Sequence, residues 1–125
     1  MATTREKGRD AERLAETWLE RRGYVVLDRN HATRGGEVDL VCRDGRVLCF
    51  VEVRSRADQG HGAPEETVDR RKALRVVAAA TDWARRHGAL DDDIRFDVVA
   101  VTGSGEGQGF ELFQGAFDSS GGSAG

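Results

Sequence analysis

The spacing of hydrophobic and polar residues changes several times along the chain, and each change marks an expected element. Residues 5–22 carry apolar side chains at the three- and four-residue spacing of an amphipathic helix, and Gly23 ends this helix. Three runs rich in β-branched and aromatic residues follow, at 24–29, 37–42 and 46–54. Asp44-Gly45, between the second and third runs, is typical of a hairpin turn.

The second half of the chain adds one helix and two strands. A Gly-rich polar loop at 57–64 precedes a helix expected at about 65–86, whose apolar residues share one face. Strands are expected at 94–101 and 110–113, with a Gly-rich turn between them. This order of helix, three strands, helix and two strands predicts an α/β fold, in which two helices flank a mixed sheet of about five strands.

Length and composition favour a single domain. With 125 residues the chain has room for one core, which we expect in residues 1–114, and the Gly- and Ser-rich residues 115–125 are expected to form a disordered tail. No apolar run approaches the length of a membrane span or a secretory signal, so we expect a cytoplasmic protein without a membrane partner. Cys42 and Cys49 lie in strand-like runs and are expected to be reduced and buried.

The net charge of −3 counts against nucleic-acid binding, because affinity for phosphates depends largely on Lys and Arg. The charge is unevenly distributed, however. Between residues 70 and 86 the chain carries six basic residues against the single acid Asp82, and they are Arg70, Arg71, Lys72, Arg75, Arg85 and Arg86. A basic face on an acidic protein is compatible with a nucleic-acid partner.

Acidic residues recur on two neighbouring strands of the expected hairpin. Strand residues alternate between faces, so Asp39 points to one face while Val38 and Leu40 point to the opposite, core face. The next strand places Glu52 among apolar neighbours near the centre of the sheet. Glu12, on the border of the apolar stripe of the first helix, can lean over the sheet edge toward the same place. The spacing therefore allows three carboxylates to meet.

Carboxylates that share a low-dielectric site repel one another and need a compensating partner. A divalent cation is one such partner, and hard oxygen ligands suit Mg²⁺ or Mn²⁺. The other is a buried ion pair with Arg54, with Arg56 or with an arginine of the second helix. The spacing favours neither, and for Glu12 taken alone an exposed helix position is the simpler interpretation.

Several short motifs together cover about residues 5–113. They are Gly8-x-x-x-Glu12-x-x-Ala15, Gly23-Tyr24, Gly35-Gly36-Glu37-Val38-Asp39-Leu40, Phe50-Val51-Glu52-Val53-Arg54-Ser55-Arg56, Lys72 and Arg95-Phe96-Asp97-Val98-Val99. In this combination they resemble the YraN family, which is similar to archaeal Holliday-junction resolvases and to the PD-(D/E)xK nucleases. The resemblance implies a restriction-endonuclease-like core.

The resemblance also implies roles for individual residues. The metal ligands it implies are Asp39, Glu52 and Glu12. Glu37 would support these ligands from its place in the same motif. Arg54 stands where the nuclease pattern has lysine, and it can still stabilise charge that develops on the phosphate. Lys72, on the second helix, can supply the missing amine.

We therefore expect a metal-dependent endonuclease that cleaves phosphodiester bonds in DNA, including branched or structured DNA, with Mg²⁺ or Mn²⁺ as cofactor. The residues expected to bind the nucleic acid are Arg56, Arg70, Arg71 and Arg75. By analogy with resolvases, a homodimer fits a junction that has two scissile strands. The alternative is a non-catalytic nucleic-acid-binding or protein-docking module on the same fold, and Arg54 in place of lysine favours it.

Overall fold

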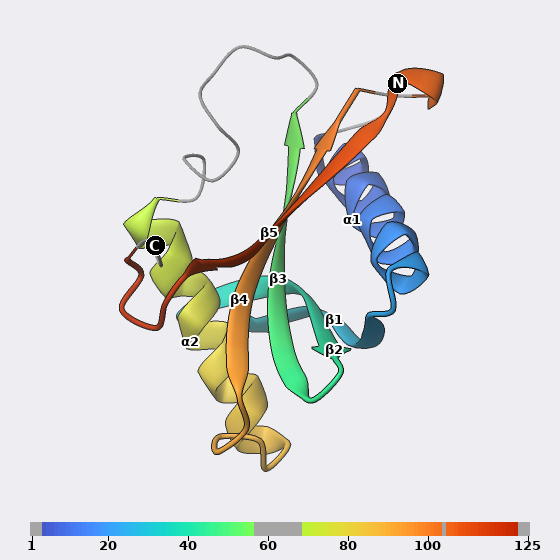
Figure 1. Cartoon of the computed structure of the whole chain (residues 1–125). Helices are drawn as coiled ribbons and strands as arrows, with labels where there is room; N and C mark the ends of the chain where they lie inside the picture. The colour runs from blue at the N-terminus through green and yellow to red at the C-terminus, as the bar shows by residue number, and fades with distance from the viewer. Residues whose placement is uncertain (1–3, 57–68, 104, 123–125) are drawn as a thin grey trace.

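A five-stranded mixed sheet runs through the molecule, with one helix on each side (Figure 1). The computed structural model describes residues 4–56, 69–103 and 105–122. The elements in chain order are α1 (Thr4–Arg21), β1 (Val25–Thr33), β2 (Gly36–Asp44), β3 (Val47–Arg56), α2 (Arg70–Arg86), β4 (Ile94–Thr102), the 3-10 turn η2 (Gly105–Gly107) and β5 (Gly109–Phe117). This is the expected α/β, restriction-endonuclease-like order. Neither helix of the described residues is long and apolar enough to cross a membrane.

The strands lie side by side in sequence order, β1-β2-β3-β4-β5. All neighbours pair antiparallel except β3 and β4, which are parallel. The tight turn between β2 and β3 uses Gly45, whose φ of 61° suits the left-handed conformation of a hairpin turn. The connection from β3 to β4 passes instead through α2, and such a helical crossover brings the next strand back in the same direction.

Each helix buries its apolar stripe against one face of the sheet. The core on the α1 face includes Leu19, Leu40 and Val51. The core on the α2 face includes Phe50 and Trp83, whose rings meet edge to face with 6.0 Å between their centroids. Both faces of the sheet are therefore covered by a helix. A polar side chain of a central strand needs either a hydrogen-bonding partner inside the protein or a place where the strands separate.

The two cysteines are register partners on β2 and β3. Cys42 and Cys49 are both fully buried, and both are free thiols. Burial raises the pKa of each thiol to about 12, so both are protonated at neutral pH. The expectation of reduced, buried cysteines is confirmed.

The second helix, α2, begins at Arg70, later than the expected start at about residue 65. Asp69 has an extended backbone, with φ −75° and ψ 173°, and its Oδ1 accepts a hydrogen bond from the backbone N–H of Lys72 at 2.9 Å. This is N-cap geometry, in which a side-chain oxygen satisfies a backbone donor of the first turn. A helix running unbroken from residue 65 is therefore wrong. The expected loop at 57–64 lies outside the described residues.

The chain stays ordered beyond the expected end of the domain. β5 continues to Phe117, whose ring stacks on Phe96 with 5.1 Å between their centroids. Gly121, farther on, is buried beside Arg70 and Leu74 at the start of α2. The prediction of a disordered tail is therefore wrong for residues 115–122, because a single large apolar side chain anchors a segment of Gly- and Ser-rich composition. Residues 123–125 lie outside the described residues.

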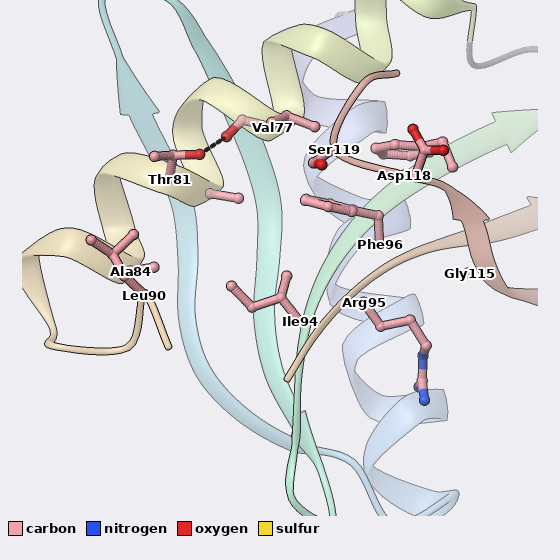
Figure 2. Close-up of a pocket in the computed structure, with 12 residues that line it drawn as sticks. Val77, Thr81, Ala84, Leu90, Ile94, Arg95, Phe96, Gly115, Asp118 and Ser119 are labelled. Atoms are coloured by element: carbon pink, nitrogen blue, oxygen red, sulfur yellow. Dashed lines mark hydrogen bonds between the residues drawn. The ribbon is translucent and has the colours of Figure 1, made fainter. Parts of the chain in front are cut away.

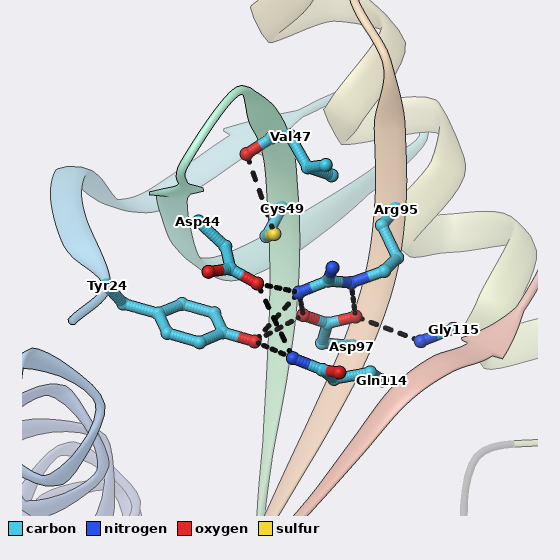
Figure 3. Close-up of polar contacts among 8 residues, drawn as sticks. All are labelled: Tyr24, Asp44, Val47, Cys49, Arg95, Asp97, Gln114 and Gly115. Atoms are coloured by element: carbon cyan, nitrogen blue, oxygen red, sulfur yellow. Dashed lines mark hydrogen bonds and ion pairs between the residues drawn. The ribbon is translucent and has the colours of Figure 1, made fainter. Parts of the chain in front are cut away.

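A buried polar network joins strands that are far apart in the sequence (Figure 3). Asp97 on β4 is fully buried, and its carboxylate accepts hydrogen bonds from Arg95 Nε at 2.8 Å, from Tyr24 Oη at 3.0 Å and from the backbone N–H of Gly115 at 3.0 Å. Arg95 Nη2 also donates to Asp44 at 2.8 Å. The network connects β2, β4, β5 and the residue before β1, so the Arg95-Phe96-Asp97 motif serves the fold.

β2 and β3 separate at one end of their pairing. Among the described residues their last matched pair is Leu40 with Val51, and beyond it β2 pairs with β1 while β3 pairs with β4. Continued register would place Asp39 opposite Glu52 at the point of separation. Val38 lies in the core of the α2 face and Leu40 in that of the α1 face. The prediction that both residues pack into one core is therefore wrong, and the change from one core to the other falls where β2 leaves the β3 ladder.

Candidate metal centre at the fork between β2 and β3

A pocket of about 420 Å³ opens where β2 and β3 separate. It collects side chains from both helices, which lie on opposite sides of the sheet, because the gap between the strands lets them meet. Its lining residues are Glu12, Glu37, Asp39, Glu52, Val53, Asp69, Arg71, Lys72, Arg75 and Val76. The three carboxylates singled out in the sequence therefore share one cavity with three basic residues.

Asp39 has a strongly perturbed carboxyl group. Burial, followed by the nearby Glu52 carboxylate, raises the pKa of Asp39 to about 9, and Glu12 adds a smaller contribution in the same direction. The backbone N–H of Val53 donates to Asp39 Oδ2 at 2.8 Å and opposes this rise. This N–H lies on the side of β3 that β2 has left, so the fork supplies it as a donor. The raised pKa favours the protonated form of Asp39 in the absence of a further cation.

Glu52 is buried and paired with a lysine from α2. Its Oε2 lies 2.8 Å from Lys72 Nζ, and the exposed fractions of the two side chains are 5% and 42%. The ion pair expected as the alternative to a metal involved Arg54, Arg56 or a helix arginine, whereas the partner in the structure is the helix lysine. The Asp69 cap starts α2 at the turn that carries Lys72, so it helps to direct this amine into the fork.

Glu12 is held by a residue that sequence reasoning missed. Asn30 Nδ2 donates to Glu12 Oε1 at 2.6 Å. Asn30 has a φ of 50°, and in the described part of the chain it is the one non-glycine residue with positive φ. Asparagine tolerates this conformation better than most residues, yet it still costs on the order of 1 kcal/mol. The sequence offered only a weak signal: Asn30 directly follows the strand expected at 24–29, and asparagine adopts positive φ more readily than most residues.

The remaining predicted site residues divide between this pocket and other surfaces. Those that line the pocket are Glu37, Arg71 and Arg75. Arg54 follows Glu52 by two positions on β3 but is not among the described residues that line the pocket. Arg70 turns toward the C-terminal segment, where its Nε donates to the carbonyl of Ser120 at 3.4 Å. The side chain of Arg56 lies outside the described residues.

The donor set of the pocket suits a hard divalent cation. Asp39 and Glu52 line the same pocket at the fork and influence each other electrostatically, and Mg²⁺ commonly takes one or two carboxylates and completes its shell with water. Within the described ranges, no three His, Cys, Asp or Glu side chains already converge in a metal-ligand arrangement. A cation held by this pair would therefore replace both the Lys72 ammonium on Glu52 and the proton on Asp39.

The raised pKa of Asp39 predicts how stability depends on pH in the absence of metal. The folded state binds this proton more tightly than the unfolded state, where the pKa is about 4. The stabilisation is present in full below about pH 4 and is lost as the pH rises through the folded-state pKa of about 9. We expect Asp39→Asn to flatten this decline in urea denaturation with EDTA. Asp91→Asn, at an exposed position, is the control, and equal pH profiles for the parent and Asp39→Asn would contradict the prediction.

A second cavity, of about 540 Å³, is an apolar groove between α2 and the strands β4 and β5 (Figure 2). Apolar side chains such as Val77, Ile94 and Phe96 line it. In Figure 2 the Arg95 side chain extends away from Phe96, and its guanidinium binds Asp97. The groove therefore offers mainly apolar contacts, whereas the clustered acidic and basic side chains line the pocket at the fork.

Comparison with known proteins places the chain in a family. Residues 11–101 match the family described as "Uncharacterised protein family UPF0102", a span that includes the acids of the fork and Lys72. A UPF0102 protein of Anaeromyxobacter sp. (strain Fw109-5) is 63% identical over 117 residues, which cover 94% of this chain and 88% of that protein. A UPF0102 protein of Chromohalobacter salexigens is 44% identical over 115 residues, which cover 92% and 93% of the two chains. The chain belongs to the UPF0102 family, which is the YraN family.

Proposed function

We propose that this protein is a divalent-metal-dependent endonuclease that hydrolyses phosphodiester bonds in DNA, including branched or structured DNA. The observation that carries the proposal is the convergence of Asp39, Glu52, Glu12 and Lys72 in one pocket at the fork. A carboxyl group with a raised pKa, here that of Asp39, beside further acids and a cationic side chain is typical of hydrolytic sites. The resemblance to junction resolvases and PD-(D/E)xK nucleases supports the same reaction.

The carboxylates of Asp39, Glu52 and Glu12 would hold the ion. Bound there, Mg²⁺ or Mn²⁺ supplies a Lewis acid for a phosphate oxygen and lowers the pKa of a coordinated water. Asn30 keeps the Glu12 carboxylate at the edge of the pocket through its hydrogen bond. Val53 keeps Asp39 directed into the fork through its backbone N–H. The chain therefore presents its acids on strands and a helix whose positions the core determines.

Lys72 supplies the amine that the nuclease pattern places two residues after the glutamate. Arg54 stands at that position of the sequence, but a guanidinium is planar and stays protonated. The Lys72 ammonium already reaches Glu52 at 2.8 Å from α2, and it is compact enough to orient a water or a phosphate oxygen once released from that contact. Arg71 and Arg75, on the same helix, line the pocket and would bind the phosphates on either side.

The test is cleavage of labelled linear, flapped and four-way DNA with Mg²⁺ or Mn²⁺. We expect Asp39→Asn, Glu52→Gln and Lys72→Ala each to lower the rate by roughly 100-fold or more, because each removes a group that acts on the reacting phosphate. Asp91→Asn, on the exposed surface, should cleave at the parent rate. Since a four-way junction has two scissile strands, a homodimer is part of the proposal. Absence of cleavage on every substrate, with both metals, would overturn it.

A non-catalytic nucleic-acid-binding or protein-docking module is the second candidate. The Lys72–Glu52 ion pair favours it, because this pair compensates one buried carboxylate without a metal ion. This reading expects DNA binding that weakens with salt and persists in Asp39→Asn, with no cleavage by the parent protein. If instead the parent cleaves DNA, and Asp39→Asn binds DNA without cleaving it, the result supports the endonuclease.

A further inference from the structure

A second polar pocket, of about 290 Å³, lies against α1 and β1 and shares a wall with the candidate metal centre. Its lining residues are Arg9, Glu12, Arg13, Glu16, Arg29, Asn30 and Leu40. Glu12 lines both pockets, so the two cavities adjoin at this carboxylate. None of the arginines here was singled out in the sequence, because the basic cluster of α2 is denser.

Both acids of this pocket are already partnered. Glu12 accepts the hydrogen bond from Asn30 at 2.6 Å. Glu16 accepts one from Arg29 Nε, also at 2.6 Å, and this hydrogen bond lowers the pKa of Glu16. Both carboxylates of this pocket therefore accept hydrogen bonds from residues of β1. In these contacts their partners are not the α1 arginines Arg9 and Arg13.

Arg9 and Arg13 line this pocket and can contact an external anion that enters it. Both side chains are exposed. In the described residues the ion pair of Arg13 is with Asp10 at 3.9 Å, and the exposed fractions of these two side chains are 79% and 64%. A pair so long and so exposed contributes little, so an anion with several acceptor oxygens can displace it. The two guanidinium groups lie one turn apart on α1 and face the same cavity.

Basic residues thus flank the carboxylates on two sides. Arg71, Lys72 and Arg75 line the pocket at the fork from α2, while Arg9 and Arg13 line the adjoining pocket from α1. A single phosphate would need only one of these two sets of basic residues. Two sets separated by the acids suit a chain of phosphates, in which one phosphodiester lies at the acids and the neighbouring phosphates contact the basic residues.

We infer that the Arg9–Arg13 pocket is a binding site for the backbone phosphate next to the cleaved bond, so that the DNA strand crosses the fork from α2 to α1. The inference rests on the proposed function, since it takes the fork as the place of the scissile phosphate. It specifies the substrate as a polynucleotide strand, because two phosphate-binding positions on either side of the acids match successive phosphates of one backbone.

The test measures binding without cleavage. Anisotropy of a labelled DNA oligonucleotide in EDTA is followed between about 50 mM and about 200 mM salt for the parent and for Arg9→Gln/Arg13→Gln. We expect the double variant to bind roughly 10-fold more weakly at low salt, and the slope of log K against log salt to decrease by about 1. The charge-matched control Arg21→Gln/Arg46→Gln changes two exposed arginines that line neither pocket, and it should keep the parent slope.

The outcomes separate this inference from the proposed reaction. A reduced slope in the Arg9→Gln/Arg13→Gln variant supports the binding site even if the parent cleaves no DNA, in which case the endonuclease proposal alone fails. A parent slope in that variant overturns the binding site, whether or not the parent cleaves. Equal loss of slope in the control also overturns it, because the effect would then reflect total charge.

Discussion

Gly36→Ala is expected to separate α2 from β2 and to lower the free energy of unfolding by roughly 3 kcal/mol or more. A Cβ at Gly36 would lie 1.9 Å from the carbonyl oxygen of Arg75 and 2.7 Å from its Cα. These are backbone atoms in the middle of a helix, so no rotamer change relieves the contact. The helix or the start of β2 has to move, and chemical denaturation measures the loss.

The same contact explains why the expected effect extends to the candidate metal centre. Arg75 lies one turn after Lys72 on α2, so a helix displaced from β2 would carry Lys72 away from Glu52. Gly35→Ala is the matched control, because a Cβ there meets Ala78 Cβ at 3.4 Å, an ordinary contact. Equal stability of the two alanine variants would contradict the prediction.

Asp97→Ala is expected to destabilise the fold by about 3 kcal/mol, as loss of one partner from a buried ion pair does. Asp97 is fully buried, and its removal would leave Arg95, the Tyr24 hydroxyl and the backbone N–H of Gly115 without their acceptor. Arg95 keeps its contact with Asp44, so the expected loss lies at the lower end for such pairs. Urea denaturation at neutral pH measures it.

A surface ion pair provides the control for Asp97. Arg43 and Asp92 lie 2.7 Å apart, with about a third of each side chain exposed. Solvent screens this pair, so Asp92→Ala should cost less than about 1 kcal/mol. If Asp97→Ala lost no more than Asp92→Ala, the network in Figure 3 would not be a main determinant of stability.

Local sequence patterns predicted the elements and their order correctly. The helical spacing of apolar residues before Gly23 and the strand-like runs on either side of Asp44-Gly45 reappear as α1, β2 and β3. The acids Asp39 and Glu52 were identified as neighbours for the same reason, since a tight hairpin turn determines which residues lie opposite each other. These features depend on interactions between residues close in the chain, which a sequence pattern records directly.

The errors at the ends of elements had local causes that periodicity does not register. The second helix was expected from residue 65, but the Asp69 side chain provides the N-cap of α2, which begins at Arg70. The composition from Gly115 onward predicted disorder, whereas Phe117 on β5 stacks on Phe96 of the neighbouring strand β4. An average over a segment hides the one side chain that anchors it.

The arrangement of the candidate site depends on contacts between distant parts of the chain. Strand alternation does not reveal where β2 leaves β3, and that fork is what lets Glu12 from one face and Lys72 from the other line the same pocket. The Lys72–Glu52 pair and the Asn30–Glu12 hydrogen bond join residues about twenty positions apart, on elements brought together by the core. Periodicity shows which face of an element is buried. Which polar groups meet at the fork is determined by how α1 and α2 pack on opposite sides of the sheet. That packing depends on the apolar area buried by the whole core, which no local pattern records.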